Sequence, residues 1–206
     1  MLLAIHPDNP DSRKIKQVAD VLVKGGVVIM PTDTIYALVC SINQYKAFES
    51  ICRIKGIKPE KANFSLICSD LSNISNYTKS FDRGIYKLLN RALPGAYTFI
   101  LEASSEVPSV FRSKKKTIGL RIPDNKIMLD LVQALGHPVV ATSLHDLDKI
   151  IEYPTDPYEI HEQFESVVDL VVDGGYGKNI ASTVIDCTSG EAVIIREGAG
   201  DVSVVG

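Results

Sequence analysis

Hydrophobic and polar positions recur with two different periods along this chain, and the two periods predict alternating helices and strands. From Ile15 to Lys24 the apolar residues follow helical spacing, Asp11 or Ser12 can cap the first turn, and Gly25 can end the last. The same spacing predicts four further helices, at Lys46 to Lys55, Phe81 to Leu93, Ile127 to Leu135 and Pro157 to Phe164.

Short apolar runs bounded by turn residues predict the strands between these helices. They are Val27 to Met30, Tyr36 to Cys40, Ser65 to Cys68, Tyr97 to Leu101, Thr117 to Ile122, Val139 to Thr142, Val168 to Val172, Ser182 to Asp186 and Ala192 to Arg196. Several runs are apolar without interruption, which is typical of strands buried on both faces. The pattern therefore predicts an α/β fold with a twisted, mixed sheet and helices on its faces. We find no internal repeat or linker and expect one domain over residues 1–206, with a flexible loop at 144–157.

Composition is that of a globular protein, with 45% hydrophobic and 23% charged residues among 206. The N-terminus turns polar after five residues, and no apolar run approaches the length of a membrane span, so we expect neither a signal peptide nor an anchor. The four cysteines are dispersed without a CxxC pair, which favours free buried thiols over a metal site or disulfides. These features predict a cytoplasmic protein with no protein-built metal site.

The net charge of -3 argues against a protein that coats nucleic acid non-specifically. The positive charge is nevertheless concentrated in two segments. Each segment alone is more typical of a solvated face than of an anion-binding surface, and its place at a helix end or a strand entry is what favours binding. The two clusters are Arg53, Lys55, Lys58 and Lys61, and Arg112, Lys114, Lys115 and Lys116.

Polar side chains at strand ends are the candidates for chemistry, because the phosphate-loop, GxGxxG, HExxH and GxSxG signatures are absent. Thr32 to Thr34 follows an apolar strand and is either the edge of a binding crevice or a turn stabilised by its own side chains. Arg121 lies in an otherwise apolar strand, where its guanidinium needs an anion. That anion is either a ligand carboxylate or phosphate, or the partner in a structural salt bridge.

Two later strands also end in polar residues. The segment VVATSLH places Ser143 at a strand end and His145 two residues beyond it. Ser182 begins another strand, and Arg196 closes the last one ahead of Gly198. Small hydroxyl residues and an arginine at such positions can contact a phosphate, although a lone histidine in a loop is more often structural.

Taken in order, PTDTIYAL, ALPGAYTFIL, TIGLRIPDN, VVATS, STVID and IIREGAG resemble the YrdC/YciO family over nearly the whole chain. IHPDNP, ICRIK, NFSLIC and DGGY are similar to the YciO branch in particular. The resemblance implies a YrdC/RibB-like fold around a basic, concave cavity. It also implies L-threonylcarbamoyladenylate synthesis from threonine, bicarbonate and ATP, for threonylcarbamoyladenosine modification of tRNA. The YciO branch is further associated with binding of double-stranded RNA.

The resemblance also assigns roles to individual residues. Thr34, Arg121 and Ser182 match positions that contact threonine, with Arg121 on its carboxylate. ATP would enter as a substrate, with Mg²⁺ carried on its phosphates. The positions that match ATP contacts are Lys55, Lys58, Asn63, Thr117, Ser143 and Arg196, and the candidates for RNA contacts are Lys114, Lys115 and Lys116.

Three positions depart from the synthase pattern. Ile57 stands where an arginine of a KxRP segment falls, Cys68 replaces a histidine that contacts threonine, and His145 replaces the asparagine of an SxN triplet. Loss of one polar contact typically costs about 1–3 kcal/mol. We therefore expect nucleotide binding with weak synthase activity, the alternative being an RNA-binding protein without synthase activity.

Overall fold

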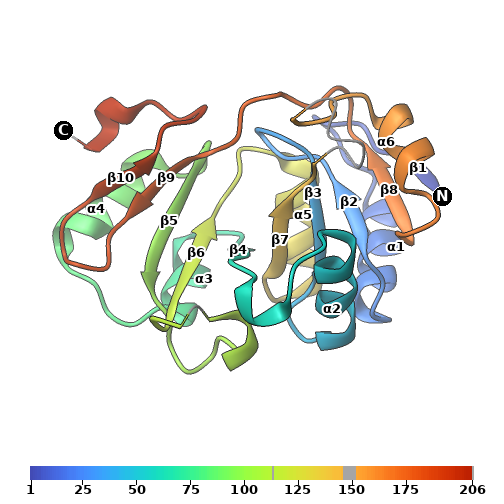
Figure 1. The fold of residues 1–206 in the computed structure, drawn as a ribbon. Coiled ribbons are helices and arrows are strands. Elements are labelled where there is room, and N and C mark those ends of the chain that lie inside the picture. Colours follow the sequence, from blue (N-terminus) through green and yellow to red (C-terminus); the bar gives the residue numbers. More distant parts are fainter. Residues whose placement is uncertain (113, 146–151, 206) are drawn as a thin grey trace.

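The computed structural model of the chain describes residues 1–112, 114–145 and 152–205. Within these ranges ten strands form one mixed sheet in the order β1-β8-β2-β3-β7-β4-β6-β5-β9-β10 (Figure 1). The strands are β1 (Leu2–Ala4), β2 (Val28–Met30), β3 (Ala37–Ser41), β4 (Ser65–Ile67), β5 (Tyr97–Glu102), β6 (Thr117–Arg121), β7 (Val139–Ser143), β8 (Leu170–Asp173), β9 (Thr183–Asp186) and β10 (Val193–Arg196). The predicted twisted, mixed α/β sheet is confirmed.

Six α-helices cover the faces of this sheet in the described residues. They are α1 (Ser12–Val23), α2 (Tyr45–Ile54), α3 (Leu71–Tyr77), α4 (Arg83–Ala92), α5 (Lys126–Leu135) and α6 (Pro157–Phe164). Short 3₁₀ turns occur at Pro59–Lys61, Ser109–Phe111 and Val202–Val205. Asp11 caps α1 by accepting a hydrogen bond from the backbone N–H of Arg13, as one of the two predicted caps.

Alternate residues of each central strand enter two separate cores, as the period of two in a strand requires. Val28 of β2 and Val39 of β3 pack in a cluster with α1 and α5. Ile29 and Leu38, their chain neighbours, point the other way into a larger cluster that includes α2. Figure 1 shows α2 in front of the strands and α1 and α5 behind them.

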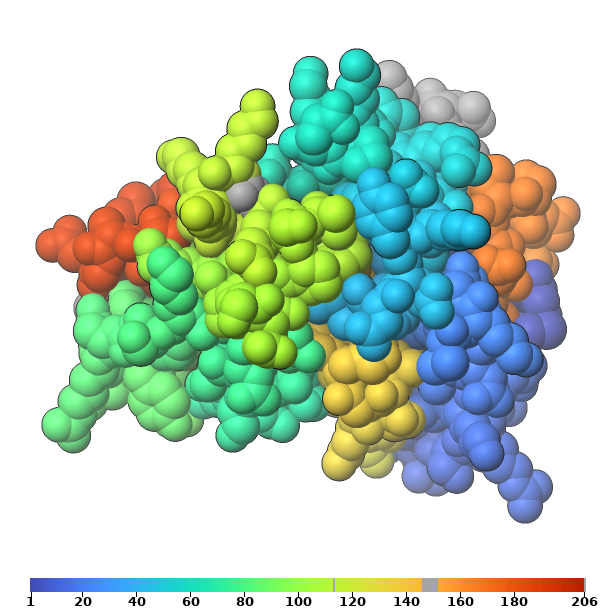
Figure 2. All heavy atoms as spheres, turned by 90° about the horizontal axis from the view of Figure 1, so that it is seen from below, coloured from blue at the N-terminus to red at the C-terminus, as the bar shows by residue number. Residues whose placement is uncertain are grey.

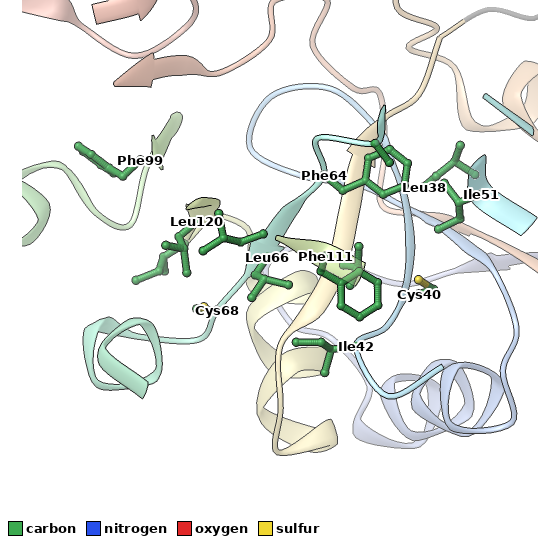
Figure 3. Close-up of a cluster of buried hydrophobic side chains, with 14 of the residues drawn as sticks. Leu38, Cys40, Ile42, Ile51, Phe64, Leu66, Cys68, Phe99, Phe111 and Leu120 are labelled. Carbon is green, nitrogen blue, oxygen red and sulfur yellow. The ribbon is translucent and has the colours of Figure 1, made fainter. Parts of the chain in front are cut away.

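The larger core is built partly from aromatic rings. Phe48 of α2 makes edge-on contacts with Phe64 and Phe111, with ring centroids 5.4 and 4.9 Å apart. Phe64 and Phe111 lie beside Leu38 and Ile51 in Figure 3. Because Phe64 precedes β4 and Phe111 ends a 3₁₀ turn, this contact holds two connecting segments onto α2.

Two elements were not predicted from the sequence. β1 has only three residues, and it is a strand because it pairs in parallel with β8. α3 buries only Ile74, so its sequence LSNISNY lacks the apolar periodicity that predicts a helix; Asp70 caps it. Residues 146–151 of the predicted loop lie outside the described residues.

All four cysteines are free and buried, as predicted. In the ranges that the structure describes, no helix is both long and apolar enough to traverse a bilayer.

Candidate functional site

A cavity of about 370 Å³ lies on the face of the sheet that α1 and α5 cover elsewhere. Pairing registers place its lining on one face, since Ser65 lies opposite both Gly119 and Ala141, and Ile100 opposite Gly119. The residues that line the cavity come from β3 to β7, β9, β10 and their connections: Ile35, Ala37, Asn63, Phe64, Ser65, Thr98, Ile100, Phe111, Thr117, Ile118, Gly119, Arg121, Ala141, Thr142, Ser143, Ala181, Ser182, Val184 and Arg196.

Small side chains keep the floor of this cavity open. Ala141, Ser65 and Gly119 lie opposite one another across β7, β4 and β6, and Ala37 lies on the next strand, β3. A Cβ added at Gly119 would lie 2.7 Å from Oγ of Ser65 and 3.2 Å from a methyl group of Thr98. The floor at Gly119 therefore accepts no larger residue without rearrangement.

Arg121 lies at one end of the cavity, at the end of β6. Its Nη2 donates to Oδ1 of Asp33 over 2.9 Å and to Oγ1 of Thr34 over 3.0 Å. Burial lowers the pKa of the guanidinium, and the carboxylate of Asp33 opposes that shift. Nε of Arg121 is buried and has no hydrogen-bond partner within the described residues. Arg121 thus forms the buried salt bridge, one of the two possibilities that the sequence left open, and its Nε stays unpartnered within the described residues.

The PTDTI segment is likewise both a turn and part of the site. Thr32 Oγ1 donates to the carbonyl of Ile35 and accepts from the backbone N–H of Thr34. Thr34 is fully buried and does not line the cavity; its hydroxyl supports Arg121.

Ser182 and Arg196 form a second polar group on β9 and β10. The hydroxyls of Ser182 and Thr98 are 2.8 Å apart, and Nη2 of Arg196 donates to the Ser182 carbonyl over 2.7 Å. Both Ser182 and Arg196 line the cavity, which places the two predicted residues together.

Lys55 and His145 meet at Ser143 on the opposite side of the lining. Nζ of Lys55 donates to the Ser143 carbonyl over 2.8 Å, and Nε2 of His145 lies 3.0 Å from the Ser143 hydroxyl. Burial lowers the pKa of Lys55 to about 8. Among the described residues neither Lys55 nor Arg196 forms an ion pair.

An open groove of about 840 Å³ adjoins the cavity and shares Asn63, Ile100 and Thr117 with it. Four cationic residues line the groove, namely Lys61, Arg112, Lys114 and Lys115, together with Glu60 and Asp186. In Figure 2 the lime segment around residue 110 lies beside the cyan segment around residue 60. Lys58 and Lys116 are exposed and line neither space.

The three departures from the synthase pattern lie in different environments. Cys68 is fully buried in the larger core (Figure 3), and burial raises the pKa of its thiol. Ile57 packs against the same core. His145, by contrast, is exposed and bonded to a residue of the cavity lining.

The sequence analysis did not single out Asp33 and Thr98, which support Arg121 and Ser182. Two signals could have identified them. Asp33 is the acid in the turn beside Thr34, and the buried Arg121 required an anion. Thr98 alternates with buried Phe99 in β5, so the pleat turns Thr98 toward the other face.

Comparison with known proteins gives a consistent family assignment. A family model described as telomere recombination, Sua5_yciO_yrdC, matches residues 20–198. The Escherichia coli K12 protein YciO, itself described as uncharacterized, is 45% identical over 199 residues, which cover 96% of this chain and 95% of YciO. The crystal structure of E. coli YciO superposes with a TM-score of 0.92 at 43% identity and covers 100% of this chain and 98% of that one.

Threonylcarbamoyl-AMP synthases are more distant relatives. The synthase of Pyrococcus abyssi is 28% identical over 186 residues, which cover 90% of this chain and 54% of the synthase. A structure of P. abyssi Sua5 complexed with L-threonine has a TM-score of 0.86 at 25% identity, over 96% of this chain and 57% of that one. This chain thus spans about half of the archaeal synthase.

We expect Asp33→Asn to lower the free energy of unfolding by about 3 kcal/mol, because it leaves the buried Arg121 without a counter-charge. Urea denaturation at pH 7 measures the change. Asp124→Asn, at an exposed position nearby, is the control and should cost less than about 0.5 kcal/mol. Equal stabilities for the two variants would contradict the importance of the pair.

Proposed function

Because this chain belongs to the Sua5/YciO/YrdC family, we propose that its cavity binds a nucleotide together with an amino-acid carboxylate. The observation that carries the proposal is which hydrogen-bond partners the cationic side chains in and beside the cavity have. Lys55 and Arg196 contact only backbone carbonyls among the described residues, and Arg121 keeps an unpartnered Nε. A desolvated cation without a counter-anion is costly, so an anionic ligand would be stabilised there.

In this proposal Arg121 and Ser182 hold the carboxylate of L-threonine, with Thr34 behind Arg121. Support comes from the unsatisfied Nε of Arg121 and from the distant relative that was solved with L-threonine. A planar guanidinium suits a carboxylate because it can donate two parallel hydrogen bonds.

The nucleotide would occupy the remaining lining, against Asn63, Thr117, Ser143 and Arg196, with Lys55 at its phosphates. A cavity of about 370 Å³ lies within the usual size range of small-molecule sites. Lys58 lies outside the lining, and its predicted ATP contact would require the ligand to extend beyond the cavity.

The reaction we propose is weak synthesis of threonylcarbamoyl-AMP. The amine of threonine captures carbon dioxide, and an oxygen of the resulting carbamate attacks the α-phosphate of ATP. The bond to the bridging oxygen breaks, and its electron pair leaves with pyrophosphate. No covalent nucleophile is needed, so catalysis would come from positioning and charge stabilisation. Mg²⁺ would arrive on the ATP phosphates and needs no protein-built cage.

A second candidate function is binding of double-stranded RNA at the groove beside the cavity. Its support is the set of cations that line this open space, among them Arg112, Lys114 and Lys115. Double-stranded RNA is recognised mainly by shape and phosphate contacts, which such a groove can supply.

We expect Lys55→Met to weaken AMP binding about tenfold or more, because it removes a charged hydrogen-bond donor. At pH 7 the variant should be at least as stable as wild type. The pKa of Lys55 is about 8 in the folded protein against its ordinary 10.5, so folding disfavours its charged form below pH 8. The stability advantage of Lys55→Met over wild type should therefore shrink as the pH rises from 8 to 10.5.

Calorimetry with AMP and urea denaturation test both expectations. Lys46→Met, an exposed position on the same helix, is the control and should change neither quantity. A Lys55→Met variant that binds AMP normally would contradict the proposed phosphate contact.

Pyrophosphate release from ATP with L-threonine and bicarbonate tests the proposed reaction. We expect a threonine-dependent rate well below that of a true synthase. Arg121→Lys should abolish this rate, because lysine keeps the positive charge but lacks the planar guanidinium that donates two parallel hydrogen bonds. A rate that is independent of threonine would contradict the assignment of Arg121 to the amino acid.

RNA binding, if the groove supports it, should weaken steeply with salt, because neutralised phosphates release counterions. Replacing both Lys114 and Lys115 with Ala should reduce the slope of log affinity against log salt by about 1–2. The matched control replaces Lys16 and Lys24, which are exposed on and beside α1, and should leave the slope unchanged. Identical slopes for the two double variants would rule out the groove.

A further inference from the structure

Ser143 is the meeting point of two titratable side chains from different parts of the fold. Its carbonyl accepts from Nζ of Lys55, which follows α2, and its hydroxyl contacts Nε2 of His145, which follows β7. Ser143 itself lines the cavity. An imidazole and an ammonium group, neither of them part of the lining itself, are therefore both bonded to one residue of the lining.

The surroundings of His145 lower the pKa of its imidazole. Desolvation is the largest cause, although the residue as a whole is exposed, and the nearby positive charge of Lys55 adds to it; Glu152 opposes both through its backbone and its carboxylate. Among the described residues, the ring of Tyr153 also lies near, with 5.2 Å between the two ring centroids. An anion that enters beside the imidazole would favour its protonated form.

We propose that His145 contacts the terminal phosphate of the bound nucleotide and, together with Lys55, makes the site at Ser143 select a dianionic phosphomonoester over a monoanionic phosphodiester. The inference rests on the proposed function and adds the charge state of the ligand that the site prefers. A phosphate monoester carries close to two negative charges at pH 7, because its second pKa is about 6. Two cations can neutralise it, whereas a diester leaves one of them unmatched.

Phosphate binding should then drive proton uptake in two separate pH ranges. The anion raises the pKa of His145 from its lowered value, so uptake at this residue occurs in the lower of the two ranges. Lys55 starts from a pKa of about 8, so its uptake occurs above pH 8. Affinity should rise as the pH falls through each range.

An asparagine at position 145 can still hydrogen-bond to Ser143 but cannot take up a proton. His145→Asn therefore removes the titratable group while keeping the hydrogen bond to Ser143. The affinity of this variant for AMP should fall below that of wild type by about two- to fivefold at pH 6.5, the effect of a pKa rise of about one unit on binding when the pKa in the free protein lies below 6.5. The two proteins should converge at pH 9, where the imidazole is neutral in both states.

Titration calorimetry of the full chain with AMP, in two buffers that differ in protonation enthalpy, counts the protons taken up. At pH 6.5 wild type should take up more protons than His145→Asn, by a sizeable fraction of one. Titration of the AMP phosphate itself is common to both proteins and cancels. Adenosine 5′-methylphosphate, a monoanion with the same base and sugar, should bind wild type more weakly than AMP, and this preference should shrink in the variant.

Equal proton uptake in the two proteins, or an equal preference for AMP, overturns the inference while AMP binding upholds the proposed function. Failure of AMP and ATP to bind wild type at any pH overturns both. If His145→Asn does not fold by circular dichroism, His145→Gln provides the same comparison, because glutamine also bonds without titrating.

Discussion

The buried pair of Arg121 and Asp33 is the interaction on which the site depends. It joins the end of β6 to the turn between β2 and β3, which are 88 residues apart in the chain. The second oxygen of Asp33 accepts from the backbone N–H of Asp124 over 3.2 Å. This single carboxylate therefore bonds both to the end of β6 and to the segment that follows it. Asp33 leaves the buried Nε of Arg121 without a partner among the described residues, so this lining residue carries a donor that their contacts do not use.

Arg196 in the cavity lining and Lys55, which bonds to the lining residue Ser143, are held in a way that preserves their charge for a ligand. Lys55 and Arg196 each donate to a backbone carbonyl, which orients the side chain without neutralising it. A carboxylate in place of either carbonyl would stabilise the fold more, but it would compete with an anionic ligand. The lowered pKa of Lys55 reflects the free-energy cost of burying its charge. The site is thus kept at some expense in stability, as is common where a binding site must remain unsatisfied until its ligand arrives.

Periodicity in the sequence predicted most of the sheet and five helices, because those elements bury a regular apolar face. It could not predict β1, whose strand pairing depends on β8 some 170 residues away, or α3, where Ile74 is the only buried residue. Strand-end chemistry singled out Ser182 and Arg196 as candidates, and both line the cavity. It could not show that Cys68 points into the core, since the side of a short strand that faces a cavity depends on its register with neighbouring strands.

The three departures from the synthase pattern are consequently unequal. A buried, fully enclosed thiol at Cys68 cannot contact a ligand, and Ile57 contributes to packing. Of the three side chains, His145 is the one that the described residues show hydrogen-bonded to a residue of the cavity lining; Cys68 reaches the lining residue Arg121 only through its backbone N–H. If each departure removed a ligand contact, the losses would multiply to about a hundredfold or more. With Cys68 in the core, its substitution acts on the shape of the site and not through a lost hydrogen bond to a ligand. The chemical difference from the synthase pattern is therefore concentrated at an imidazole whose pKa its surroundings lower.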